Sequence, residues 1–248
     1  MKSLFLFTLS LLVFSLCNGQ EQQNRTNWKE FNLKEKVKYL SEITYDVVEE
    51  NGTLQKGNLK DHLEYRFHEQ GHKVEEIWYR LDNSSLKWTY KYDSVRKRIE
   101  ACATPDDYFF TYKYDEQSNK TEVNKYIDGI WVWEERFKYD TQNNLIEAII
   151  FHLGDLYGQK NYQYDAQGNR IEVNTYVPDG SLYNKKVYRY DEKGNEIEVK
   201  TYNSYGRLES KQAYQYQYDK QGNWIKKTEY EDNKPIQITE REIQYYQN

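Results

Sequence analysis

The sequence predicts an all-β protein, an antiparallel meander of tandem β-hairpin repeats that forms one long curved or rolled sheet. First, one pattern, YQYDAQGNRIEVNTY at residues 162–176, recurs along most of the 248-residue chain. Second, aromatic and β-branched residues alternate with polar ones inside this pattern, which is the two-residue period of a strand. Third, successive copies start 22 to 28 residues apart, a spacing typical of repeat architectures.

The turn of the hairpin lies in the middle of the pattern. Asp165 begins a type I turn, because its side chain can accept a hydrogen bond from the backbone two residues further on. Gly168 supplies the left-handed conformation of the bulge that closes such a turn. Ile171 and Val173 then alternate with polar residues, so the chain returns as a second half-buried strand.

The copies differ most at the glycine of this turn. They start near residues 65, 90, 112, 137, 162, 188, 216 and 243, and the last is truncated. In place of Gly168, three other copies carry Asn143, Ser118 and Arg96. Asparagine tolerates a positive φ better than serine or arginine does. We therefore expect the turns at Ser118 and Arg96 to be distorted or of another type.

A second reversal joins each copy to the next. Asn51-Gly52 and Asp128-Gly129 lie between alternating runs, and such pairs are strong hairpin signals. One repeat is therefore two strands and two reversals, and the whole is a meander of about fifteen strands. No linker interrupts residues 37–248, which we assign to a single β-repeat domain. Residues 20–36 form an N-terminal lead-in, with one helical turn expected at 32–36.

The 26 tyrosines suggest how the repeats pack. Equivalent tyrosines of neighbouring repeats can form cross-strand ladders, each aromatic pair adding about 0.5–1.5 kcal/mol beyond the area it buries. We expect Tyr, Ile and Val inside a curved sheet, with Lys, Glu and Gln outside and the tyrosine hydroxyls in contact with water. Whether the sheet closes, and the oligomeric state, stay open.

The first residues read as an export signal. Lys2 precedes an apolar run from Leu4 to Leu16, and residues 1–19 are predicted to be a signal peptide cleaved after Gly19. Cys17 leaves a lipoprotein anchor as the alternative, although Leu16 fits such a motif poorly. We expect a secreted, periplasmic or cell-surface protein. The net charge of −5, with both signs interspersed, provides no basic surface for nucleic acid.

The Y-x-Y-D-x-x-G-N cores at Tyr162, Tyr188 and Tyr216 resemble the YD repeats of RHS-type proteins. The resemblance covers residues 65–248, and the chain looks most like the small secreted YD-repeat proteins of Bacteroidetes. In the larger bacterial proteins such repeats form a spiralling β-sheet that encloses a toxin, and they have been linked to carbohydrate binding. This chain is too short for a full shell, so the resemblance does not imply encapsulation here.

Neither a metal nor a cofactor is expected. Six aspartates at equivalent turn positions raise the possibility of a calcium site, but each is better explained as capping its own turn. These are Asp93, Asp115, Asp140, Asp165, Asp191 and Asp219. His62, His68 and His72 are a weak candidate for a metal cluster, since His68 and His72 occupy turn positions that we expect to face solvent.

Catalysis has equally weak candidates. Asp106, Asp107, Glu134 and Glu135 offer a carboxylate pair for glycoside hydrolysis, but acid pairs are common in a chain with 40 acidic residues. Cys102 has no identifiable base partner and is predicted to be an inert thiol. We predict that the protein is not an enzyme.

Three tryptophans, Trp78, Trp131 and Trp133, are the candidate ligand-binding residues. Trp131 and Trp133 are expected on one strand face, where they can stack on a sugar ring or, as is commoner, pack in a core. The favoured function is a binding or scaffolding module for carbohydrate or a cell-envelope protein. A polysaccharide-acting hydrolase or accessory protein is the alternative. An outer-membrane barrel is disfavoured by lysines and glutamates on both faces of most strands, so no integral membrane protein is expected.

Overall fold

The computed structural model describes residues 27–247, so the predicted signal peptide and Cys17 lie outside the described residues. Sixteen strands follow one short helix in these residues, close to the expected number of about fifteen. The elements are α1 (Asn27–Glu30), β1 (Val37–Glu50), β2 (Thr53–Phe67), β3 (Lys73–Tyr79), β4 (Ser85–Tyr92), β5 (Arg98–Thr104), β6 (Tyr108–Tyr114), β7 (Lys120–Ile127), β8 (Ile130–Tyr139), β9 (Leu145–His152), β10 (Asp155–Tyr164), β11 (Arg170–Tyr176), β12 (Leu182–Tyr190), β13 (Glu196–Asn203), β14 (Leu208–Tyr218), β15 (Trp224–Glu231) and β16 (Lys234–Tyr245).

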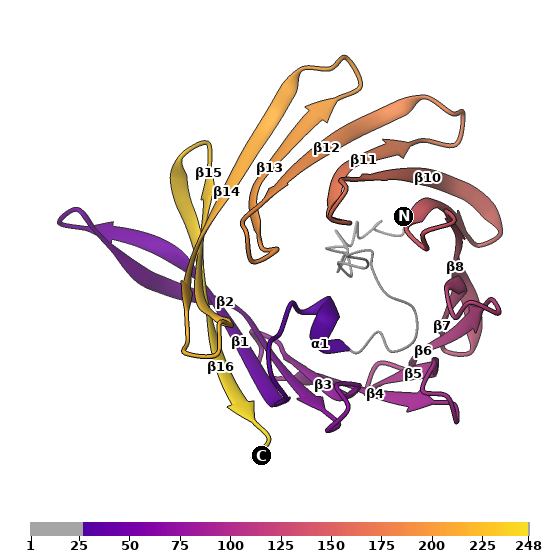
Figure 1. Cartoon of the computed structure of the whole chain (residues 1–248), viewed down its shortest axis with the longest axis horizontal. Helices are drawn as coiled ribbons and strands as arrows, with labels where there is room; N and C mark the ends of the chain where they lie inside the picture. Colours follow the sequence, from indigo (N-terminus) through magenta and orange to yellow (C-terminus); the bar gives the residue numbers. More distant parts are fainter. Residues whose placement is uncertain (1–26, 248) are drawn as a thin grey trace, which may run out of the picture.

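The sheet is an antiparallel meander that closes on itself. Every strand pairs with its neighbours in sequence, and β16 pairs with β1, so the sixteen strands form a closed barrel. The β1–β16 ladder runs from Val37 opposite Tyr245 to Asp46 opposite Gln237. In Figure 1 the strands accordingly surround a common centre. Closure leaves no sheet edge open to pairing with another chain. No helix in residues 27–247 is long and apolar enough to cross a membrane.

The repeated turn forms as the residues predict. The Oδ1 atom of Asp165 accepts hydrogen bonds from the amides of Gln167 (3.0 Å) and Asn169 (2.8 Å), while the Asn169 side chain donates to Oδ2 (3.0 Å). Gly168 has φ 81° and its amide donates to the Asp165 carbonyl at 3.1 Å. Burial by itself raises the pKa of Asp165, but these hydrogen bonds together outweigh it and hold that pKa below its usual value.

The expectation of distorted turns at Ser118 and Arg96 is wrong. Arg96 (φ 67°) and Ser118 (φ 69°) adopt the same left-handed conformation as Gly168. Their amides donate to the carbonyls of Asp93 (3.0 Å) and Asp115 (3.1 Å), as in the glycine turn. The surrounding ladder and the capping aspartate therefore impose the conformation on residues that disfavour it.

Residues 27–36, which we call the entry segment, lie against the face of the sheet that points into the ring (Figure 1). The Phe31 ring packs on Tyr65 and Phe67, with centroids 4.6 and 5.8 Å away. This identifies the inner face, and residues directly opposite one another on neighbouring strands share it. The expected helical turn at 32–36 is absent; α1 precedes it, where Asn27 bonds to Glu30 at 2.5 Å.

The entry segment also bridges distant repeats at one end of the barrel. The Asn32 side chain donates to the Lys193 carbonyl (3.1 Å) and to Oδ1 of Asn195 (2.9 Å). The Lys34 amide donates to Oδ1 of Asn223 at 2.7 Å, and the Asn223 side chain returns a bond to the Lys34 carbonyl at 3.0 Å. The entry segment thus contacts the turns of the repeats that start at residues 188 and 216.

The outer face carries the expected charged pairs. In four repeats a basic residue of the first strand lies opposite a glutamate of the second, and the charged groups are 2.5 to 3.5 Å apart. The pairs are Lys91–Glu100, Lys113–Glu122, Lys138–Glu147 and Arg189–Glu198. Exposed pairs like these contribute little energy each, but they keep this face soluble and in register.

The inner face is less apolar than predicted, because cations lie among its aromatic rings. Lys73 is buried and forms a 2.5 Å ion pair with Glu76, while its ammonium lies 4.8 Å from the centroid of the Tyr90 ring. The Arg98 guanidinium lies 4.6 Å from the same ring, and that of Arg170 lies 4.8 Å from Tyr188. The expectation that lysine stays outside is therefore wrong for these positions.

In four repeats the second tyrosine of the pattern does not keep its hydroxyl in water. It donates instead to a backbone carbonyl of the preceding repeat, at 2.6 to 2.9 Å. The bonds run from Tyr92 to Lys73, Tyr114 to Arg98, Tyr139 to Lys120 and Tyr190 to Arg170. Each bond spans about one repeat, so it joins neighbouring hairpins in a fixed register.

Candidate functional site

The aspartate turns show no arrangement for a cation. All lie at one end of the barrel, because they join even-numbered strands to the odd-numbered strands that follow. At Asp165 and Asp191 both carboxylate oxygens already accept hydrogen bonds from their own turn. Among residues 27–247, no three His, Cys, Asp or Glu side chains are placed to hold a metal ion.

The three histidines do not come together. His68 is exposed at its turn, whereas His72 is buried, with its ring 5.2 Å from that of Tyr92. The expectation that His72 faces solvent is wrong because α1 covers this turn: the Trp28 amide donates to the Gly71 carbonyl at 3.3 Å. Burial lowers the pKa of His72.

His62 belongs to a cluster that only the strand register reveals. Ser41 on β1 lies opposite Glu64 on β2, and the Ser41 Oγ atom is 3.2 Å from Nε2 of His62. The nearest Glu64 oxygen is 3.7 Å from the same nitrogen. A serine–histidine–acid triad needs the hydroxyl on one ring nitrogen and the carboxylate on the other. This cluster therefore lacks the geometry that activates a serine.

The acidic candidates for hydrolysis are separated. Asp106 is held by an ion pair with Arg80 in the turn after β5. Glu134 and Glu135 are adjacent on β8, so their side chains point to opposite faces of the sheet. Glu134 pairs with Arg136, while Glu135 accepts a 3.0 Å hydrogen bond from the Trp133 indole. These residues do not converge on a glycosidic bond.

Cys102 on β5 is a half-buried free thiol. Its Sγ atom lies 3.5 Å from a Glu100 oxygen. Burial, and then the hydrogen bond and charge of Glu100, raise the pKa of this thiol. A raised pKa reduces the thiolate fraction that a nucleophile needs.

The three candidate tryptophans do not share a face. Trp133 on β8 lies opposite Lys125, but Trp131 lies opposite Tyr126, so Val132 is an extra residue in the ladder. This bulge puts Trp133 on the inner face and Trp131 on the outer one, where its indole donates to Asn124 at 3.0 Å. The expectation that Trp131 and Trp133 share a face is wrong because of this bulge.

Trp78 on β3 also lies on the inner face. It packs beside the entry segment, and its indole donates to Asp61 at 2.5 Å. Of the three candidates, Trp78 and Trp133 can therefore contact a ligand inside the barrel. Each is half-buried, so part of its ring is accessible.

Trp133 is the centre of a ring cluster that the sequence did not reveal. The Tyr157 ring lies 5.2 Å from Trp133, and the His152 ring lies 5.9 Å from Trp133 and 6.3 Å from Tyr157. Tyr157 is 55% exposed, which is unusual for a ring in an aromatic cluster. We call Trp133, His152 and Tyr157 the aromatic platform. Its members come from three consecutive strands, and only their register unites them.

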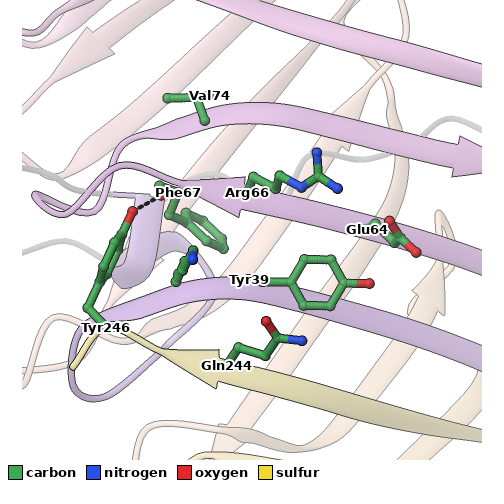
Figure 2. Close-up of a pocket in the computed structure, with 8 residues that line it drawn as sticks. Tyr39, Glu64, Arg66, Phe67, Val74, Gln244 and Tyr246 are labelled. Carbon is green, nitrogen blue, oxygen red and sulfur yellow. Dashed lines mark hydrogen bonds between the residues drawn. The ribbon is translucent and has the colours of Figure 1, made fainter.

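A groove of about 590 Å³ lies where β16 meets β1 and β2. Figure 2 shows Tyr39, Glu64 and Arg66 along it, with Tyr246 arching over to donate its hydroxyl to the Phe67 carbonyl at 2.7 Å. Burial, then Glu64, raises the pKa of Tyr39 to about 12. Arg66 is already paired with a glutamate on β3 at 2.8 Å. These contacts brace the closure of the barrel rather than offer free polar groups.

Comparison with known proteins identifies the family of the chain and solved structures with a similar fold. Residues 106–240 match the family model described as Teneurin YD-shell, which is more than half of the chain. No curated protein matches the chain.

Among solved structures, the barrel is similar to a porin-like protein from Bacteroides uniformis. The TM-score is 0.59 at 11% identity, over 85% of this chain and 98% of that one, which is a likeness of fold alone. The TcdB2–TccC3 complex gives a TM-score of 0.34 at 14% identity, over 82% of this chain and 14% of that one.

Proposed function

The chain belongs to the Teneurin YD-shell family, and from this premise we propose that it is a non-catalytic module that binds glycans on its inner face. The observation that carries the proposal is the aromatic platform, whose Tyr157 ring is 55% exposed. Aromatic faces carry partial negative charge and attract the polarised C–H groups of a sugar ring. A binding site of this kind needs no reactive group.

The polar groups beside the platform suit a sugar. Glu135 accepts a hydrogen bond from the Trp133 indole, which fixes the orientation of that ring. Rings that are fixed before binding lose little conformational entropy when a ligand arrives. His152 on β9 is itself a member of the platform, and its ring nitrogens can hydrogen-bond to a ligand there.

Trp131 and Trp133 provide a matched test on one strand. Trp133→Ala and Tyr157→Ala are compared with Trp131→Ala on a glycan array and by isothermal titration with any polymer that binds. We expect each platform variant to weaken binding about tenfold or more, with Trp131→Ala unchanged. Equal binding by all three variants would refute a site on the platform. If the protein captures an envelope protein and binds no glycan, its partner is a protein rather than a glycan.

We also propose that the protein works in the cell envelope or outside the cell. Support comes from the apolar run of Leu4 to Leu16 after Lys2, with small residues near Gly19. The mass of the mature protein tests this: a chain beginning at Gln20 is expected. A lipid-modified Cys17 would make it an anchored lipoprotein, and retention of Met1 would refute export.

A further inference from the structure

Three lysines on the stretch of the inner face from β7 to β12 lack an ion pair with an acidic residue. Lys125 on β7 lies opposite Trp133, Lys160 on β10 opposite Ala148, and Lys186 on β12 opposite Val173. These partners place all three ammonium groups on the inner face, and each side chain is half-buried. We call them the inner lysines.

Their pairing differs from that of other lysines in the barrel. Outer lysines such as Lys113 and Lys138 lie 2.7 and 2.5 Å from a glutamate oxygen. None of the inner lysines has a carboxylate oxygen within 4.0 Å among the described residues. Removing an ammonium group from water without a counter-ion costs free energy. A bound ligand with negative charge would offset that cost.

Two acids of this stretch contact other residues. Glu135 accepts a hydrogen bond from the Trp133 indole at 3.0 Å, and Glu196 lies 3.6 Å from Arg170. The Lys125 ammonium lies over two rings, 4.7 Å from the Tyr108 centroid and 5.8 Å from that of Phe110. The three ammonium groups of this stretch of the wall therefore have no direct ion pair.

The surroundings of two of these groups also affect their pKa. Burial lowers the pKa of Lys125. Burial also lowers the pKa of Lys160; the charge of Glu135 opposes this effect, and the charges of Lys186 and Arg170 add to it. A bound anion beside these ammonium groups would reverse both effects, because an opposite charge favours the charged form.

We propose that the ligand of the inner face is an acidic glycan, whose carboxylate or sulfate groups pair with Lys125, Lys160 and Lys186 while its sugar rings stack on the aromatic platform. The inference rests on the proposed glycan-binding function and adds the chemical class of the ligand. The platform, on β8 to β10, lies between Lys125 on β7 and Lys186 on β12. One extended chain can therefore touch both kinds of group.

The test uses polygalacturonate, chondroitin sulfate and a neutral galactan, each titrated into the mature protein. We expect at least one acidic polymer to bind about tenfold tighter than the galactan. The acidic polymer that binds more tightly shows whether the site prefers carboxylate or sulfate groups. Lys160→Met and Lys186→Met should each weaken binding of that polymer about threefold to tenfold and leave galactan binding unchanged. Lys185→Met is the matched control, because Lys185 is the neighbour of Lys186 on the outer face and pairs with Glu172 at 3.4 Å.

A second measurement needs no variant. Rising sodium chloride concentration should weaken binding of the acidic polymer and leave galactan binding unchanged, since salt screens charge pairs. If galactan binds as tightly as both acidic polymers and its binding depends on Trp133, the ligand is not specifically an acidic glycan, while the proposed glycan-binding function stands. No binding of any polymer would refute both. An equal effect of Lys185→Met and Lys186→Met would show that only net charge matters and would overturn the assignment to the inner lysines.

Discussion

Replacing Arg96 by glycine should stabilise the protein. Arg96 is exposed and holds φ 67°, where glycine copies of the same turn hold 80° to 85°. A left-handed conformation costs a residue with a Cβ about 1–2 kcal/mol. The greater freedom of glycine in the unfolded chain offsets about 0.4–1 kcal/mol of that gain. The expected net gain in the free energy of unfolding for Arg96→Gly is therefore about 0.5–1 kcal/mol.

Urea unfolding followed by circular dichroism measures this gain, and thermal unfolding should show a rise in Tm of about 1–4 °C. Ser118→Gly should behave in the same way, since Ser118 is also exposed, with φ 69°. Asn143→Gly is the contrasting control. Asparagine tolerates this conformation, and the variant loses the 2.9 Å hydrogen bond from Asn119 to Asn143. A loss of stability in Arg96→Gly and Ser118→Gly would refute the reasoning that the turn, rather than the residue, sets the conformation.

Three further predictions concern the joints between repeats, the buried ion pair and the turns. Tyr139→Phe removes the 2.8 Å bond to the Lys120 carbonyl and should lower the free energy of unfolding by about 1 kcal/mol. Glu76→Gln removes the carboxylate that is paired with the buried Lys73 ammonium and should cost about 3–5 kcal/mol. The pKa of Asp165 is held low in the folded state, so its contribution is present above the unfolded value of about 4 and lost as the pH falls through the folded value. Urea unfolding at pH 7, 5 and 3 checks this.

Each of these has a control in the chain. Tyr183→Phe alters a phenol that is 61% exposed and should have no measurable effect. Glu122→Gln breaks the exposed pair with Lys113 and should cost far less than Glu76→Gln; similar losses would contradict the role given to burial. Asp165→Asn should flatten the pH dependence, and stability that rises between pH 5 and pH 3 would reverse the assigned sign.

The hairpin pattern was enough to predict the meander, because its information is local. Asp165 and Gly168 specify the turn, and Ile171 and Val173 specify the returning strand, within ten residues of one another. Closure was not predictable from such a pattern. It depends on the pairing of β1 with β16, whose register is set by strands some 200 residues apart.

The charged inner face left a signal that strand alternation concealed. Lys73, Arg98, Lys120 and Arg170 occupy the same place in four copies, directly after the last turn residue. That place begins the second strand. The bulge of the turn shifts the register between Gln163 and Tyr164, and Tyr164 pairs with Arg170. Simple alternation counted across the bulge therefore misassigned the face.

The same effect separates Trp131 from Trp133, and it makes the chain its own control. A bulge at Val132 puts two tryptophans of one strand on opposite faces, and ordinary alternation does the same for Lys185 and Lys186. In both pairs the two residues share type and neighbourhood and differ in the face they occupy. If binding responds to Trp133 and Lys186 but not to Trp131 and Lys185, neither composition nor net charge can explain it. The inner face of the closed barrel would then be the functional surface, because face is the variable that separates the members of each pair.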